Sequence, residues 1–174
     1  MTNKQITIED NFLDIKAFDE LQNIIMGASE PVPFPWYYNN LIDYEDDVNK
    51  FQFIHQLFMN LPTSNSLYVV TPILQILQSV SVYRIKANLL TRTPKIVENQ
   101  FHTDMGALSI EKQNQWTTSI FYINTNNGYT KFKDGTIVES IANRMVTFPS
   151  DLPHTGTSCT DEKTRVVINF NYFK

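Results

Sequence analysis

The chain has 174 residues, 42% of them hydrophobic and 13% aromatic, which suits one domain over residues 1–174 that buries its core without disulfides. Its 18 acidic and 14 basic side chains give a net charge of −4, so no overall field favours nucleic acid or an anionic membrane as a partner. Cys159 is the only cysteine, the first ten residues are polar, and no apolar run is long enough to span a bilayer, which together predict a soluble protein of the reducing cytoplasm.

Residues 1–79 are predicted to form a helical support around an aromatic loop. A short strand is indicated at residues 6–8 by their β-branched side chains. Apolar residues then recur at helical spacing from Ile15 to Gly27. Asp14 suits the N-terminal cap of this helix, and Gly27 suits its C-terminal end.

Residues 31–38 contain three prolines, which lack amide donors and bias their neighbours toward extended conformations, so a loop is predicted there. Its aromatic side chains either form a lid over a substrate or pack on the core, and the sequence favours neither. A second amphipathic helix is predicted over residues 48–58, with His55 on its surface and not a metal ligand. A third helix is predicted from Thr71 to about Gln78, because a threonine cap precedes a proline that suits a first helical position.

The second half of the chain, residues 80–174, changes to strand-like composition. Segments rich in β-branched and aromatic residues alternate with turn signals such as Asn-Asn-Gly at 126–128. The predicted strands cover residues 82–90, 116–123, 129–132, 136–139, 144–148 and 165–173. Many short strands with tight turns predict a mainly β fold with about three flanking helices, of the sandwich or barrel class, which includes the double-sheet jelly roll.

Two histidines and an aspartate are the candidate metal ligands. Asp104 follows His102 by two residues, and residues i and i+2 of an extended strand point to the same face. His154 lies fifty residues beyond this pair, and Arg165 follows His154 by eleven. Two imidazoles and one carboxylate are the donor set of a facial triad, which holds iron(II) and leaves its other positions open.

An ordered series of motifs resembles the iron(II) and 2-oxoglutarate-dependent dioxygenases, and within them the prolyl-hydroxylase-like branch. The series is residues 101–104 (FHTD), 119–124 (SIFYIN), 128–132 (GYTKF), 143–154 (NRMVTFPSDLPH) and 164–172 (TRVVINFNY). The compact chain looks like the members carried by bacteria and their viruses. The resemblance implies a double-stranded β-helix, the jelly-roll barrel of that family, with its site at the open mouth.

The resemblance also implies a role for each site residue. His102, Asp104 and His154 would hold iron(II), and the metal with 2-oxoglutarate and oxygen would hydroxylate or demethylate a substrate. The guanidinium of Arg165 would pair with the distal carboxylate of 2-oxoglutarate through two parallel hydrogen bonds. Three more residues would contact the cosubstrate: Tyr122 by donating to the same carboxylate, Ile120 by packing on the methylenes, and Asn88 at the end nearest the iron.

The chain also departs from the family. Val167 stands where some members have a serine two residues after the basic residue, and Asn171 lies near a position where others have a tryptophan. The substrate, small molecule or peptidyl, is not carried over by the resemblance. Two alternatives remain: a cupin-like jelly roll that binds a metal or small ligand without turnover, and an iron oxygenase that does not use 2-oxoglutarate.

A basic cluster precedes the metal motif. It is predicted to be solvated, with guidance of an acidic substrate as the alternative function. Its members are Arg84, Lys86, Arg92 and Lys95.

Overall fold

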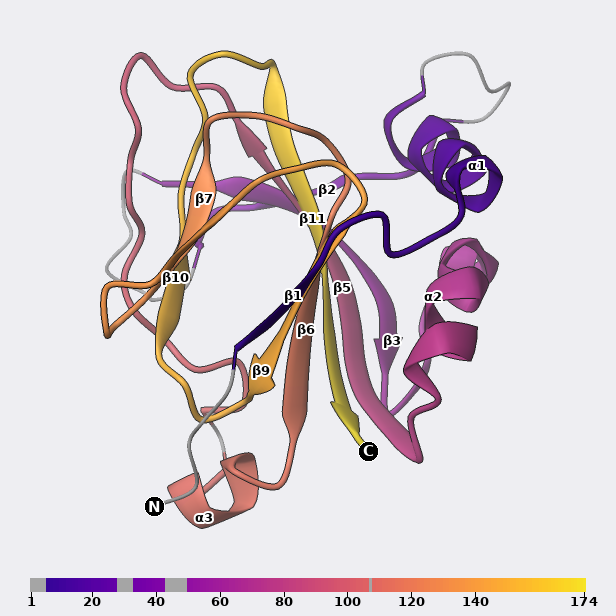
Figure 1. Ribbon diagram of the computed structural model, residues 1–174. Coiled ribbons are helices and arrows are strands. Elements are labelled where there is room, and N and C mark those ends of the chain that lie inside the picture. The colour runs from indigo at the N-terminus through magenta and orange to yellow at the C-terminus, as the bar shows by residue number, and fades with distance from the viewer. Residues whose placement is uncertain (1–5, 28–32, 43–49, 107) are drawn as a thin grey trace.

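The computed structural model describes residues 6–27, 33–42, 50–106 and 108–174, and two antiparallel sheets dominate it (Figure 1). In the larger, eight-stranded sheet, seven strands follow the order β1, β9, β6, β11, β5, β3, β2, and β4 pairs with β3. These strands are β1 (Thr7–Glu9), β2 (Tyr37–Asn39), β3 (Gln52–Met59), β4 (Leu61–Pro62), β5 (Ser81–Thr91), β6 (Thr117–Tyr122), β9 (Arg144–Pro149) and β11 (Thr164–Phe173). The smaller sheet has the order β10, β7, β8, with β7 (Tyr129–Phe132), β8 (Ile137–Glu139) and β10 (His154–Gly156).

Three α-helices accompany the sheets in the described part of the chain: α1 (Ile15–Met26), α2 (Thr71–Leu77) and α3 (Ile110–Gln113). A 3₁₀ helix, Asn65–Val70, leads into α2. The predicted fold class is confirmed, because the molecule is mainly β with two antiparallel sheets and three helices, consistent with a double-stranded β-helix. No helix among the described residues is long and apolar enough to cross a membrane.

Helices α1 and α2 cover the outer face of the larger sheet, and the smaller sheet lies across its inner face (Figure 1). The outer core joins the two helices to the sheet and includes Phe18, Ile73, Ile85, Phe121 and Ile168. A smaller core lies between the two sheets and consists of Ile120, Tyr122, Phe132, Val138, Val146, Phe148 and Val167.

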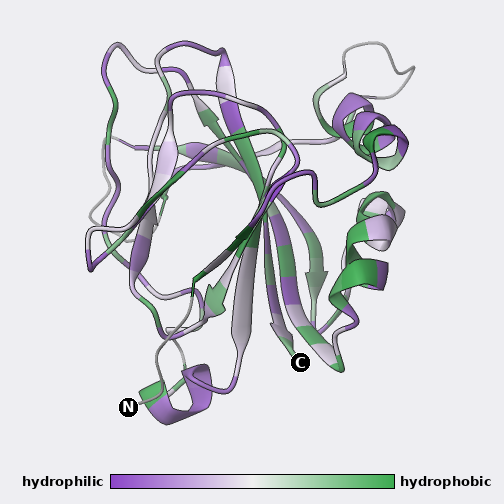
Figure 2. Cartoon of the chain, viewed as in Figure 1, coloured by the Kyte–Doolittle hydropathy of each residue, from purple (hydrophilic) through white to green (hydrophobic). Residues whose placement is uncertain are grey.

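The two longest strands, β5 and β11, alternate between an apolar outer face and a polar inner face. On β5, Ile85 and Ala87 are buried in the outer core, while Arg84 makes inward contacts and Lys86 and Asn88 line the hollow described below. Bands of alternating hydropathy along the strands of the larger sheet are visible in Figure 2. On these two strands, alternation therefore places apolar side chains against the helices and mostly polar ones between the sheets.

Helix α1 forms as predicted. The Asp14 side chain accepts a hydrogen bond from the Ala17 amide at 3.1 Å, and the Gly27 amide donates to the Asn23 carbonyl at 2.7 Å at the other end. The residues that α1 buries lie three and four positions apart: Phe18, Leu21 and Ile25. The third predicted helix is also confirmed as α2, although Thr71 is its first helical residue and does not cap it.

The predicted helix over residues 48–58 is wrong. Its described part, from residue 50, contains strand β3, which pairs with β5 and adds to the larger sheet. A β-bulge between Gln56 and Phe58 interrupts the two-residue alternation, so the apolar positions of this strand imitate a helical spacing. His55 is consequently not a surface residue: it is 2% exposed, and its Nε2 lies 2.7 Å from Ser64 Oγ.

The predicted loop over residues 31–38 is partly a strand. Residues 31–32 lie outside the described part of the chain, and Tyr37 and Tyr38 belong to β2 at the edge of the larger sheet. Phe34 is buried in the outer core, and Trp36 packs against it with ring centroids 5.2 Å apart. Phe34 and Trp36 thus pack on the core, as the second of the two alternatives predicted, whereas Tyr37 and Tyr38 lie at the sheet edge and are 58% and 65% exposed.

Candidate active site

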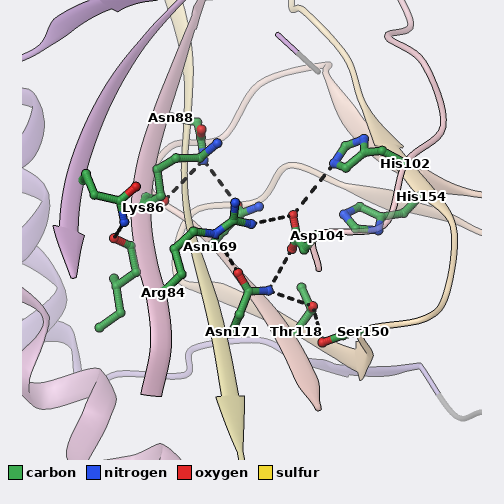
Figure 3. Close-up of polar contacts among 12 residues, drawn as sticks. Arg84, Lys86, Asn88, His102, Asp104, Thr118, Ser150, His154, Asn169 and Asn171 are labelled. Carbon is green, nitrogen blue, oxygen red and sulfur yellow. Dashed lines mark hydrogen bonds and ion pairs between the residues drawn. The ribbon is translucent and has the colours of Figure 1, made fainter. Parts of the chain in front are cut away.

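Backbone pairing brings the two histidines together. His154 begins β10, and an isolated bridge joins it to His102, with each backbone amide donating to the other residue's carbonyl at 3.0 Å. Their rings lie with centroids 4.8 Å apart. Donor atoms of His102, Asp104 and His154 all lie within 4.8 Å of one another (Figure 3). The structure therefore assembles the three predicted ligands at one point.

The expected strand geometry for His102 and Asp104 is wrong in one respect. His102 lies in a single bridge rather than a strand, and Asp104 lies in the turn that follows it. Strand alternation therefore does not orient the carboxylate. Side-chain hydrogen bonds do so instead, as the surroundings of Asp104 show.

Asp104 is enclosed by donors. Arg84 Nη2 donates to its Oδ1 at 2.9 Å, and Asn171 Nδ2 donates to its Oδ2 at 3.0 Å. Burial alone would raise the pKa of the Asp104 carboxyl, but Arg84, His154 and His102 outweigh it and hold this pKa far below its usual range. The carboxylate is thus ionised at neutral pH, as a metal ligand must be.

Both imidazoles are oriented for metal binding. His154 Nδ1 lies 3.1 Å from the Leu152 carbonyl and His102 Nδ1 lies 3.3 Å from the Gln100 carbonyl, so each Nδ1–H donates to the backbone and each Nε2 is left as an acceptor. Burial, partly offset by Asp104, lowers the pKa of His154 to about 4. His154 is therefore neutral at pH 7, the state that binds a metal.

Arg165 lies on the inner face of β11 and is 4% exposed. Its Nε donates to Ser140 Oγ at 2.8 Å, its Nη2 donates to Thr130 Oγ1 at 3.2 Å, and its Cζ lies 5.7 Å from the centroid of the Tyr122 ring. Burial lowers the pKa of Arg165, and no carboxylate in the described part of the chain pairs with it. A buried cation without an anionic partner is costly, which points to an anionic ligand.

Thr130 links Arg165 to Tyr122. The hydroxyl of Tyr122 donates to Thr130 Oγ1 at 2.8 Å, and Arg165 Nη2 donates to the same oxygen. Since both bonds use the threonine oxygen as acceptor, its own O–H remains to donate, and Thr130 lines the hollow beside the metal ligands. Tyr122 is fully buried and does not itself line the hollow, so its connection to the hollow is the hydrogen bond to Thr130.

One hollow contains both the candidate metal ligands and Arg165. Its walls bring together the metal ligands, Arg165, and the predicted contacts Ile120 and Asn88, which come from β6 and β5. Asn88 Nδ2 donates to the Lys86 carbonyl at 3.2 Å and lies 3.5 Å from Asn169 Oδ1. The other lining residues are Ile42, Gln52, Lys86, Leu90, Asn99, Thr130, Gly156, Val167 and Asn169.

Gly128 makes room for Arg165. A β-carbon at this position would lie 2.7 Å from Arg165 Cδ and 2.7 Å from the Ser158 carbonyl oxygen, closer than any side chain allows. The glycine that begins the GYTKF motif is therefore required by the close approach of both the arginine side chain and the Ser158 backbone carbonyl. Thr130, two residues later, faces the hollow because strand β7 alternates its side chains.

Several residues of the site were not predicted from the sequence. Arg84 was expected to be solvated, yet it is half-buried against Asp104. Thr130 and Ser140 hold Arg165, and Asn171 holds Asp104. For Asn171, the sequence did contain a signal: asparagines 169 and 171 alternate with apolar residues on β11. Polar residues on a buried strand face a cavity or one another.

No protein-family model and no curated protein matches the chain. Solved structures do. A prolyl hydroxylase from Trichoplax adhaerens, in complex with a hypoxia inducible factor peptide fragment, matches 98% of this chain and 84% of its own with a TM-score of 0.67 and 11% identity. The viral collagen prolyl hydroxylase of Paramecium Bursaria Chlorella virus-1, in its 2-oxoglutarate complex, matches 99% of this chain and 97% of its own with a TM-score of 0.63 and 13% identity.

A prolyl-4-hydroxylase from Pseudomonas putida matches 99% of this chain and 94% of its own, with a TM-score of 0.55 and 14% identity. The chain therefore has the fold of the iron(II) and 2-oxoglutarate oxygenases, with the histidine and aspartate triad assembled in it. Within that class, prolyl hydroxylases, viral and bacterial ones included, are prominent among the matching structures. The resemblance inferred from the sequence is thus confirmed for the fold and for the assembly of the triad.

Proposed function

We propose that this protein is an iron(II) and 2-oxoglutarate-dependent dioxygenase, which couples oxidative decarboxylation of 2-oxoglutarate to hydroxylation or demethylation of a second substrate. The observation that carries the proposal is Arg165, a buried cation that shares a hollow with the three metal ligands. No carboxylate in the described part of the chain pairs with it. A dicarboxylate that reaches from the metal to this arginine would use both features.

The donor set fits iron(II). Two imidazoles and a carboxylate on one side of an ion are typical of non-haem iron oxygenases, and a closed structural zinc site would require a fourth protein ligand. When bound, iron(II) with 2-oxoglutarate and oxygen supplies the oxidising chemistry. The part of His102, Asp104 and His154 is to hold the metal from one side and leave its remaining positions accessible from the hollow.

The part of the hollow around Arg165 also fits the cosubstrate 2-oxoglutarate. The guanidinium of Arg165 would pair with the distal carboxylate, and the Thr130 hydroxyl, held by Tyr122 and Arg165, would donate to the same group. Ile120 and Val167 both line the hollow and would pack on the methylenes. Since Val167 replaces the serine of some family members, we assign the hydroxyl contact to Thr130. Asn88 would face the end of the cosubstrate nearest the metal.

The second substrate is proposed to be a small molecule or a peptide. Among the matching structures, the Trichoplax adhaerens enzyme is bound to a peptide and the epimerase SnoN to nogalamycin RO, so the fold accommodates both kinds of ligand. In this chain, the lining of the hollow also includes Lys86, Asn88 and Asn169, which favours a substrate with polar groups at the oxidised end.

The test is anaerobic reconstitution with iron(II) and 2-oxoglutarate. We expect the weak visible charge-transfer band of the chelate and a higher melting temperature with both ligands than with iron alone. Binding of iron without either response to 2-oxoglutarate would refute the proposal and favour the cupin-like alternative or an oxygenase that does not use 2-oxoglutarate.

A further inference from the structure

Asp104 is oriented by two other side chains rather than by its own backbone. It lies in a turn, and both of its carboxylate oxygens accept hydrogen bonds: Oδ1 from Arg84 Nη2 at 2.9 Å and Oδ2 from Asn171 Nδ2 at 3.0 Å (Figure 3). The Asp104 side chain is 4% exposed, so water does not compete for these bonds. The sheet thus fixes the carboxylate through side chains.

Arg84 and Asn171 act as one unit. They are register partners on the neighbouring strands β5 and β11, and Arg84 Nε donates to Asn171 Oδ1 at 2.9 Å. Asn171 Nδ2 also donates to Thr118 Oγ1 at 3.0 Å. Because the arginine requires an acceptor and the carboxylate requires a donor, only one orientation of the Asn171 amide satisfies both neighbours. Asn171 and Thr118 are both 0% exposed, so the unit is anchored in the rigid interior of the larger sheet.

The arrangement favours one carboxylate oxygen as the metal ligand. Oδ1 of Asp104 lies 3.8 Å from His102 Nε2, whereas Oδ2 is held by Asn171 in the direction of β11. A carboxylate that binds through one oxygen occupies one coordination position, and one that binds through both occupies two. A facial triad requires its remaining positions for other ligands, so the difference is functional.

We propose that Arg84 and Asn171 are positioning residues that hold Asp104 so that it ligates the metal through Oδ1 alone. This inference rests on the proposed function, because it takes the triad to be a metal site. Neither residue touches the metal or the cosubstrate in this scheme. Their hydrogen bonds orient the Asp104 carboxylate, which lies in a turn and is not oriented by a strand. Hydrogen bonds from such neighbours to a ligating side chain are known to orient and tune metal ligands.

Variants that conserve charge separate positioning from electrostatics. Arg84→Lys keeps the positive charge, but an ammonium lacks the planar fork that bonds Asp104 and Asn171 at once. Asn171→Ala removes a neutral donor and acceptor. Both variants therefore loosen the carboxylate without changing the net charge of the site. Arg92→Lys and Asn114→Ala make the same changes at exposed positions and are the matched controls.

The experiment is titration of the metal-free protein with Co(II), which reports its ligands through visible absorption. We expect Arg84→Lys and Asn171→Ala to bind Co(II) about 10- to 100-fold more weakly than the unsubstituted protein. At saturation their spectra should differ from that of the unsubstituted protein, which a mere loss of stability would not cause. The two substitutions together should weaken binding by less than the product of their separate effects, because they act on one carboxylate. The controls should bind normally.

Two contrary results have different meanings. Co(II) affinity and spectrum unchanged in Arg84→Lys would overturn the positioning role and leave the metal site intact. No Co(II) binding by the unsubstituted protein would instead contradict the metal site and the proposed function with it. Melting temperatures of the metal-free variants are measured alongside, and if Asn171→Ala does not fold, Arg84→Lys alone decides the matter.

Discussion

Arg165 is the residue on which the proposed use of 2-oxoglutarate depends. Its charge is buried, and its hydrogen-bond partners in the described part of the chain are the neutral hydroxyls of Thr130 and Ser140. A residue that served folding alone would be expected to have an acidic partner, because an uncompensated buried charge lowers stability. We therefore interpret Arg165 as a proposed binding residue, whose cost to stability a bound anion would offset.

Replacement of Arg165 by methionine tests this role. We expect Arg165→Met to retain iron(II) and to lose about 2 to 5 kcal/mol of 2-oxoglutarate binding free energy, as when one partner of a buried charge pair is truncated. The metal-free variant should melt at or above the temperature of the unsubstituted protein, because a buried charge has been removed. Calorimetric titration measures the affinity, with Arg92→Met as an exposed control. Unchanged affinity for 2-oxoglutarate would exclude Arg165 from the site.

His154 predicts a pH dependence of the metal-free protein. Burial lowers its pKa from 6.5 to about 4 in the folded chain, so between these values the unfolded state binds the proton and the folded state does not. The contribution of His154 to the free energy of unfolding is therefore complete above about pH 6.5. It is lost as the pH decreases toward 4, and the loss is at most about 3 kcal/mol.

Urea unfolding at pH 7 and pH 5 measures this loss. His154→Phe removes the titrating group next to Phe132 and Phe148 and should lose less stability over this interval than the unsubstituted protein. His55, whose pKa is also lowered by burial, contributes to the acid sensitivity of both proteins, so the comparison isolates His154. Equal losses in the two proteins would contradict the assignment.

At the scale of elements, strand β7 and the turn before it form the wall that holds Arg165. A β-carbon at residue 128 would contact the arginine side chain, so Gly128→Ala should displace it. We expect 2-oxoglutarate affinity to fall at least tenfold, about 1.4 kcal/mol, with iron affinity unchanged. Calorimetric titration with each ligand checks both parts.

Gly135→Ala is the control for this substitution. Residue 135 has a φ of +95°, and a β-carbon there would contact nothing within 4 Å. The variant should lose stability through backbone strain while binding 2-oxoglutarate normally. A Gly128→Ala protein that binds both ligands normally would show that the close packing around Arg165 is not required.

The sequence predicted the elements whose pattern is regular and local. Strands β5, β6, β7, β9 and β11 and helices α1 and α2 have steady periodicity, and each was predicted to within two residues at either end. Strand β3 was mistaken for a helix because its bulge disturbs the alternation. Strands β2, β4 and β10 and helix α3 have two to four residues and were missed, because they lack the Asn-Gly and Asp-Gly turns that delimit the equally short β7.

The site was predictable where residue type and order suffice. His102, Asp104, His154 and Arg165 are chemically distinctive, and the structure brings them to one hollow. Arg84, Thr130, Ser140 and Asn171 are ordinary residues whose importance arises from register across strands, such as the pairing of Arg84 with Asn171. Register depends on tertiary structure, which spacing along one chain does not reveal.

At the scale of the whole molecule, the division of faces explains how the barrel can be both stable and polar inside. The helices cover the apolar outer face of the larger sheet, where the larger core lies, and a smaller apolar core occupies only part of the space between the sheets. The inner face of β5 and β11 is thereby available for Arg84, Asn88, Asn169 and Asn171. Strand β3 lies next to β5 and widens the larger sheet beside the hollow.

In the proposed function, the triad and Arg165 serve one reaction. The most direct measurement is succinate formation when oxygen is admitted to the anaerobic complex of the protein with iron(II) and isotopically labelled 2-oxoglutarate. We predict labelled succinate from the unsubstituted protein, and none above background from His154→Phe or from Arg165→Met at the same concentration of 2-oxoglutarate. Absence of succinate from the iron-loaded unsubstituted protein, or equal amounts from all three proteins, would contradict this account.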